Sequence, residues 1–86
     1  MFLWQHAMTD EGDHLHAKFK KLGDLPGRSF AEITTHVSLD PEEVTYLDDG
    51  TRTYRWSKPG YEITILCDRA DRCIEVMHEC TRLFAE

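Results

Sequence analysis

Residues 43–78 read EVTYLDDGTRTYRWSKPGYEITILCDRADRCIEVMH, and this stretch decides the fold. It contains four segments rich in β-branched and aromatic residues, which are typical of strands. Three turn sequences separate them, at 48–50, 57–60 and 68–71. Asp-Asp-Gly at 48–50 suits a type I turn followed by a glycine in the left-handed conformation. Pro-Gly at 59–60 also indicates a turn, because proline has a fixed φ and glycine accepts a positive φ. The stretch therefore predicts a four-stranded antiparallel meander.

The register of this meander follows from its alternating apolar residues. A slip of one residue would move every apolar side chain to the other face, so the pairing that gathers them on one face is preferred. The predicted pairs are Val44 with Tyr54, Leu47 with Thr51, Trp56 with Tyr61, Tyr54 with Ile63, Ile65 with Ile74 and Ile63 with Val76, with Thr53 opposite Thr64 and Arg55 opposite Glu62 on the other face.

The two faces of the predicted sheet differ in polarity, as a sheet covered on one side requires. The core face carries Val44, Tyr46, Tyr54, Trp56, Tyr61, Ile63, Ile65, Cys67, Ile74, Val76 and His78. The opposite face has a polar centre beside an apolar end, and its residues form a candidate protein interface: Leu47, Thr53, Arg55, Glu62, Thr64, Leu66, Cys73, Glu75 and Met77. Clustered apolar side chains mark interaction patches, although scattered exposed leucines are also common on solvated sheets.

Two short helices are predicted before the sheet. Apolar residues recur at helical spacing over 13–22, with Asp13 as N-cap and Gly23 as the stop. A capping box, Ser29 followed by Glu32, opens a second helix over 29–37. Residues 9–12 indicate a polar loop, and 1–12 and 80–86 are expected to be the mobile ends of one domain spanning 1–86. The predicted fold is α+β in two layers, with both helices on one face of the meander.

Composition restricts the classes of partner. Ten Lys and Arg residues against sixteen Asp and Glu residues give a formal net charge of −6, which disfavours binding to nucleic acid backbones. No apolar run reaches membrane-spanning length, and the N-terminus lacks the pattern of a signal peptide. Three cysteines match no disulfide framework or zinc signature, which indicates a reducing compartment, the cytoplasm.

The residues suggest little chemistry. Five histidines have no metal-ligand spacing, so no metal, cofactor or enzyme activity is predicted. Cys73 is expected to be exposed and Cys67 buried, on opposite faces, so that no disulfide joins them. One alternative from another functional class is an enzyme or sensor that binds a metal or small molecule in a pocket near His36, Tyr61 and His78.

Three sequence segments resemble a known module. The runs 27–33 (GRSFAEI), 59–68 (PGYEITILCD) and 72–74 (RCI), with a hairpin ending in Trp56, resemble the small-lipoprotein (SmpA/OmlA) and β-lactamase-inhibitor-protein-like module. Cys67 stands where that module usually has an aromatic residue, and Asp71 replaces a turn glycine. The lipoprotein signal is missing, so the envelope role is not implied. The resemblance implies a helix pair on an antiparallel sheet and a binding role without catalysis, and small cytosolic bacterial proteins are similar.

We therefore expect a protein-binding or inhibitor-like module that uses the uncovered sheet face, with a protein partner that the sequence does not identify. A further alternative is a structural homodimer formed through an edge strand, either 44–47 or 74–78. The expected state is a monomer or a weak homodimer.

Overall fold

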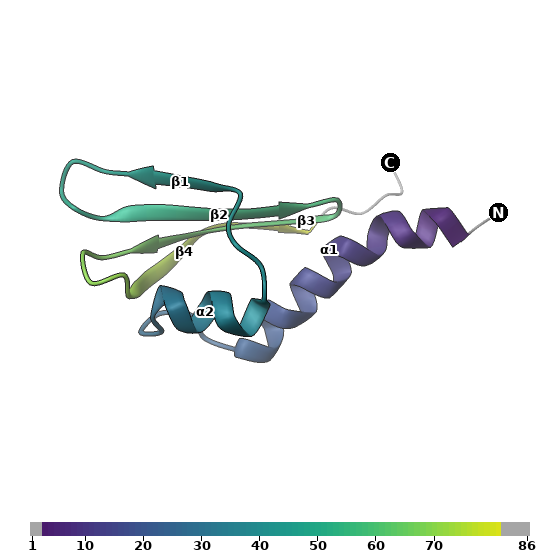
Figure 1. Ribbon diagram of the computed structural model, residues 1–86, viewed down its shortest axis with the longest axis horizontal. Helices are drawn as coiled ribbons and strands as arrows, with labels where there is room; N and C mark the ends of the chain where they lie inside the picture. Colours follow the sequence, from purple (N-terminus) through teal and green to yellow (C-terminus); the bar gives the residue numbers. More distant parts are fainter. Residues whose placement is uncertain (1–2, 82–86) are drawn as a thin grey trace.

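Two helices precede a four-stranded antiparallel sheet in the computed structural model, which describes residues 3–81 and the side chains of residues 11–81. The elements are α1 (Leu3–Leu22), α2 (Phe30–Val37), β1 (Glu43–Tyr46), β2 (Arg52–Lys58), β3 (Tyr61–Cys67) and β4 (Cys73–Thr81). The strands lie in the order β1-β2-β3-β4, with both helices on one face of the sheet (Figure 1). The predicted α+β arrangement is confirmed.

Helix α1 begins at Leu3, well before the predicted start at Asp13. The expected loop at 9–12 is helical, and Gly12 within it packs against another part of the chain. A Cβ atom there would overlap the carbonyl oxygen of Pro59, in the turn between β2 and β3. The glycine that suggested a loop therefore permits close packing of the helix on this turn. At the other end Gly23 stops the helix as predicted, with φ of 77°.

Helix α2 begins with the predicted cap. The backbone N–H of Glu32 donates to the Ser29 hydroxyl at 3.0 Å. Within the described residues, the Glu32 carboxylate accepts a hydrogen bond at 2.6 Å from Arg28 and not from the Ser29 backbone N–H, so only the Ser29 half of the predicted capping box forms. Below the cap, Ile33 and Val37 are fully buried.

The first hairpin has the predicted register and turn. Val44 pairs with Tyr54. The Leu47 N–H donates to the carbonyl of Thr51 at 2.9 Å, and the Gly50 N–H donates to the carbonyl of Leu47 at 3.1 Å. Gly50 has φ of 91°, the left-handed conformation that this turn requires.

The second hairpin is shifted by two residues from the prediction. Strand β2 continues to Lys58, which pairs with Tyr61 across a turn of Pro59 and Gly60, so Trp56 lies opposite Ile63. The predicted pairs were therefore wrong, and the observed ones are Tyr54 with Ile65, Thr53 with Leu66 and Arg55 with Thr64. A shift of two keeps every side chain on its face. Trp56 is buried and Arg55 is half-buried, as the predicted faces require.

The third hairpin departs further, because its turn is tighter and β4 carries irregularities. Asp71 adopts φ of 62° in the place of a turn glycine, and Cys73 consequently lies opposite Cys67. Register shifts between positions 64 and 65 and between 66 and 67 then leave Ile74 and Met77 without direct cross-strand partners. The observed pairs are Ile65 with Val76, Ile63 with Glu79 and Thr64 with His78.

Several predicted positions are wrong. Cys73 is buried rather than exposed, and His78 pairs with Thr64 on the uncovered face rather than joining the core. Cys67 and Cys73 are free thiols, but they lie opposite each other, so the reason given for the absence of a disulfide was wrong. Besides His78, four residues expected in the core are exposed: Ile74 and Val76 on β4, and Val44 and Tyr46 on β1, where the register is as predicted.

The described core lies between the helices and the two central strands. It comprises Leu15, Phe19, Leu22, Leu25, Ile33, Val37, Tyr54, Trp56, Tyr61, Ile63, Ile65, Cys67 and Cys73. Aromatic rings link the layers: Phe30 stacks on Tyr54 with centroids 3.8 Å apart, and Phe19 meets Trp56 edge-on at 5.2 Å. The Trp56 indole N–H donates to the carbonyl of Leu39 at 2.9 Å, so its polar atom is satisfied. Strand β4 continues to Thr81, and residues 82–86 of the expected mobile end lie outside the described residues.

Candidate functional site: a groove between α1 and β4

The predicted interface face is uncovered by the helices, but its apolar end does not assemble. Cys73 belongs to the core, and Leu66 is half-buried between Thr53 and Glu75 in its cross-strand row. Leu47 follows β1, while Met77 lies at an irregularity of β4, the opposite edge strand. The centre of this face is therefore polar, and its apolar members are separated.

Ion pairs occupy the middle of the uncovered face. The Arg55 Nε lies 3.0 Å from a carboxylate oxygen of Glu62, and its Nη1 lies 3.1 Å from one of Glu43. Arg55 and Glu62 are diagonal neighbours rather than directly opposite, because the register differs from the prediction. One guanidinium thus links β1, β2 and β3 across the face.

The pocket considered near His36, Tyr61 and His78 is not formed. Tyr61 is buried, its hydroxyl donates to Glu79 at 2.6 Å, and its ring stacks on His16 with centroids 4.6 Å apart. Burial, reinforced by Glu79, raises the pKa of Tyr61 well above its usual value. His36 is exposed on α2, and His78 is exposed on the other face of the sheet. The three side chains are not brought together.

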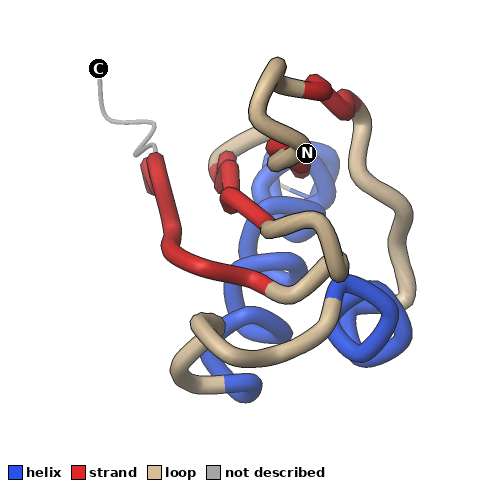
Figure 2. Tube along the Cα trace, turned by 90° about the vertical axis from the view of Figure 1, so that its left-hand side faces the viewer, coloured by secondary structure: helices blue, strands red, loops and turns tan. Residues whose placement is uncertain are grey.

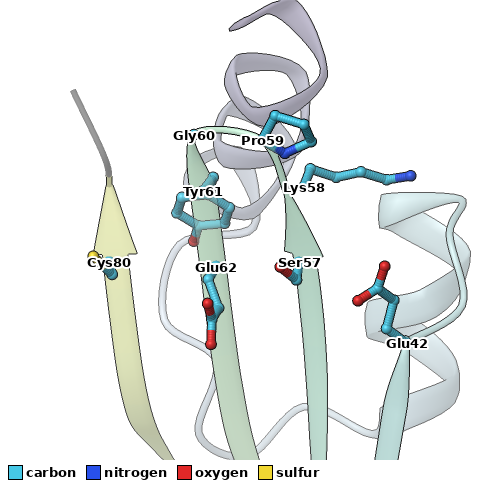
Figure 3. Close-up of a pocket in the computed structure, with 8 residues that line it drawn as sticks. All are labelled: Glu42, Ser57, Lys58, Pro59, Gly60, Tyr61, Glu62 and Cys80. Carbon is cyan, nitrogen blue, oxygen red and sulfur yellow. The ribbon is translucent and has the colours of Figure 1, made fainter. Parts of the chain in front are cut away.

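A shallow depression of about 290 Å³ lies at the end of the sheet next to the turn between β2 and β3. Figure 3 shows its lining, contributed by all four strands or the segments beside them: Glu42, Ser57, Lys58, Pro59, Gly60, Tyr61, Glu62 and Cys80. Its charged groups are two carboxylates and one ammonium group. Within residues 3–81 as described, no cluster of His, Cys, Asp and Glu side chains is suited to hold a metal ion.

A second hollow, about 340 Å³ in volume, lies on the helix side of β4 and is more apolar. It is lined by the last turns of α1, the following loop and the two neighbouring strands: Phe19, Lys20, Gly23, Asp24, Leu25, Pro26, Ile63, Val76 and Glu79. We call it the α1–β4 groove. Figure 2 shows why it stays open: β4, which leads to the C-terminus, lies on the far side of α1 from α2. Helix α2 therefore does not cover this edge.

Exposed apolar side chains concentrate at the two edges of the sheet. Among the described side chains, every large apolar residue that is exposed lies in β4 or in or directly after β1: Val44, Tyr46, Leu47, Ile74, Val76 and Met77. Val76 is 38% exposed and also lines the α1–β4 groove. Edge strands with exposed apolar residues are surfaces on which other chains pair or pack.

Sequence reasoning placed Val76 in the core and assigned no role to Leu25. No signal in the sequence shows which edge of the sheet stays open. Neighbouring strands are about 4.8 Å apart, so four strands are wider than one helix, whose diameter with side chains is about 10 Å. One helix therefore cannot cover all four strands, and the edge left open depends on the side of α1 on which α2 packs (Figure 2).

Comparison of the chain with protein-family models, with curated proteins and with solved structures found no match. The resemblance to the small-lipoprotein and β-lactamase-inhibitor-protein-like module stays a prediction. Neither helix of the described residues combines the length and the apolar character that crossing a membrane requires.

Proposed function

We propose that this chain is a protein-binding module and that its anchor site is the α1–β4 groove. The observation that carries the proposal is the position of Val76, which is exposed in the wall of an apolar groove and has Ile74 and Met77, also exposed, beside it on the same strand. Apolar anchors in concave, mostly apolar sites supply most of the energy in protein recognition.

The groove suits an apolar side chain of a partner segment that lies along β4. Phe19, Leu25 and Ile63 supply its floor and walls. Its volume of about 340 Å³ is at the lower end of the range for small-molecule pockets, roughly 300–1,000 Å³, and fits one inserted side chain. A partner that inserts such a side chain would bury apolar surface that the fold leaves exposed to solvent, and this burial would favour binding.

Charged residues define the rim of the groove. Lys20 contributes one ammonium group to the lining, and Asp24 and Glu79 contribute two carboxylates. The chain carries a net charge of −6, so a partner segment with basic residues flanking its apolar anchor would be steered toward it. The uncovered face next to β4, with Leu66 and Glu75, would form the outer margin of the same contact.

We also propose a reducing compartment, the cytoplasm, for this activity. The support is the state of the thiols, since Cys67, Cys73 and Cys80 are all free although the first two face each other. Structural disulfides are typical of oxidising compartments.

Selection of peptides tests the proposed function. A displayed library of random nine-residue peptides is selected on the folded protein, and the enriched peptides are titrated while backbone amides are followed by NMR. We expect enriched sequences with an apolar anchor next to basic residues, and shifts at 19–26 and 74–79.

A matched pair of variants sharpens the test. Val76→Asp should abolish binding, whereas Val44→Asp should retain it, because Val44 has nearly the same exposure, 39%, but lies on the other edge. Shifts confined to β1 or to the uncovered face, or equal loss of binding in both folded variants, would place the site elsewhere.

A further inference from the structure

The free edge at β1 presents a second surface, independent of the α1–β4 groove. Val44, Tyr46 and Leu47 are 39%, 72% and 42% exposed. Strand β1 stands at the end of the strand order, and among the described residues no strand lies beyond it (Figure 1). The Arg52 guanidinium lies 5.5 Å from the centre of the Tyr46 ring, which holds this exposed ring beside the sheet.

The backbone of β1 is arranged for pairing on its outer side. The Leu47 N–H bonds to Thr51 of the first hairpin, and in an antiparallel ladder such hydrogen-bonded positions alternate. Positions 43, 45 and 47 therefore direct their backbone groups toward β2. Val44 and Tyr46 direct theirs toward the free edge, in the direction of any added strand.

We propose that β1 pairs antiparallel with β1 of a second copy of this chain, about a twofold axis at Thr45, joining the two four-stranded sheets into one. In this register the outward backbone groups of Val44 meet those of Tyr46 of the other copy, forming hydrogen-bonded pairs on both sides of the axis.

The side chains of this register are self-complementary. Val44 of one copy lies opposite Tyr46 of the other, which pairs a β-branched residue with an aromatic residue. Thr45 lies opposite Thr45 of the other copy. Both kinds of pair are favourable across strands. Glu43 lies opposite Leu47, so no two like charges face each other within residues 43–47. The ladder between β1 and β2 has no register shift, in contrast to β4, and a regular edge is the better template for a second strand.

Cysteine cross-linking tests the register directly. Thr45→Cys, in a Cys80→Ser background, should form a covalent dimer when incubated with glutathione disulfide, since position 45 faces itself in a close, non-hydrogen-bonded pair. Thr53→Cys in the same background is the control. Thr53 lies on β2, opposite Thr45, so both β1 strands of the dimer would separate the Thr53 residues of the two copies. Cysteines at these positions would lie too far apart to form a disulfide.

Sedimentation measures the association without new thiols. The unmodified chain should show a concentration-dependent shift from monomer to dimer, which Tyr46→Lys should abolish and Val76→Asp should leave unchanged. A monomer at all concentrations up to about 1 mM, or a dimer indifferent to Tyr46→Lys, would overturn the proposal. Equal cross-linking at positions 45 and 53 would also overturn it. If Thr45→Cys fails to fold, sedimentation of the unmodified chain decides.

Discussion

The central strands and the edge strands carry similar residues but differ in burial. Strand β3 alternates buried and half-buried positions along its whole length, and β2 does so between Thr53 and Ser57, whereas every residue of β1 is exposed. Strand β4 is buried only at Cys73, although it also contains Ile74, Val76 and Met77. Apolar composition alone therefore does not identify a core strand in this molecule.

The helix layer accounts for the difference. Helix α1 contacts β2 and β3, and its Phe19 meets the rings of Trp56 and Tyr61 on these two strands. Helix α2 lies on the side of α1 away from β4 (Figure 2), so the helix layer leaves β4 open, and every residue of β1 is exposed as well. The contrast separates a centre that supplies stability from two edges that we propose as surfaces for other chains.

The largest expected difference between centre and edge concerns thiol reactivity. At pH 8, Cys80 should react with an aromatic disulfide reagent at least about 10³-fold faster than Cys67 and Cys73, because the latter two are reached only through opening of the fold. Burial raises the pKa of Cys67 to about 12 and also raises that of Cys73, so little reactive thiolate forms. Absorbance of the released thiol measures the three rates.

The same pKa shift gives a sign for stability against pH. A thiol whose pKa is raised by folding stays neutral in the folded state while the unfolded chain ionises above about pH 9. Its contribution to the free energy of unfolding is complete below that pH and is lost as the pH rises toward about 12.

Unfolding supplies the control for the thiol rates. In denaturant all three thiols should react at the same rate. A Cys73 that reacts rapidly in the folded protein would show that the first residue of β4 is not buried.

Truncation of aromatic residues compares the two regions in free energy. Trp56→Ala should lower the free energy of unfolding by about 3–5 kcal/mol, since Trp56 is fully buried between both helices and the sheet. Tyr46→Ala, at a residue 72% exposed, should change it by roughly 0.5 kcal/mol or less. Urea unfolding at low protein concentration, where no dimer forms, measures both. Similar losses would mean that the β1 edge is covered in solution.

The sequence predicted the parts of the fold that depend on local chemistry. The cap at Ser29, the stop at Gly23 and the turn closed by Gly50 were confirmed. The second register failed because Pro59 and Gly60 suit two turns that differ by two residues. Both turns leave the apolar residues on one face, so the hydrophobic pattern does not distinguish them.

The remaining errors arise from tertiary effects that a linear pattern does not contain. The left-handed conformation of Asp71 has no glycine to indicate it, and it brings Cys73 into the core. The α1–β4 groove depends on the tertiary placement of α2, which packs on the side of α1 away from β4. Its members, such as Leu25 and Val76, look like ordinary core residues in the sequence.

An intermediate effect is expected where α1 meets the tip of the central hairpin. Gly12→Ala should lower the free energy of unfolding by about 1–3 kcal/mol, because the new Cβ would overlap the Pro59 carbonyl and displace the helix. Alanine's higher helix propensity, worth about 1 kcal/mol, opposes this loss. The control is Ala17→Gly, at an exposed position of the same helix, which should cost about 1 kcal/mol through propensity alone. Stabilisation by Gly12→Ala would show that α1 does not approach this turn.

The smallest expected effect lies in the ion pairs that join centre to edge. Arg55 on β2 pairs with Glu62 on the central strand β3 and with Glu43 on the edge strand β1. The Glu62 side chain is 30% exposed and that of Glu43 is 61% exposed, so solvent and salt screen the second pair more strongly. Double-mutant cycles with Arg55→Met, Glu62→Gln and Glu43→Gln should give a larger coupling for the central pair and a coupling for the edge pair that vanishes in high salt. Equal couplings with equal salt dependence would mean that β1 is held as firmly as the central strands, and its edge would then be as well ordered for pairing as the interior of the sheet.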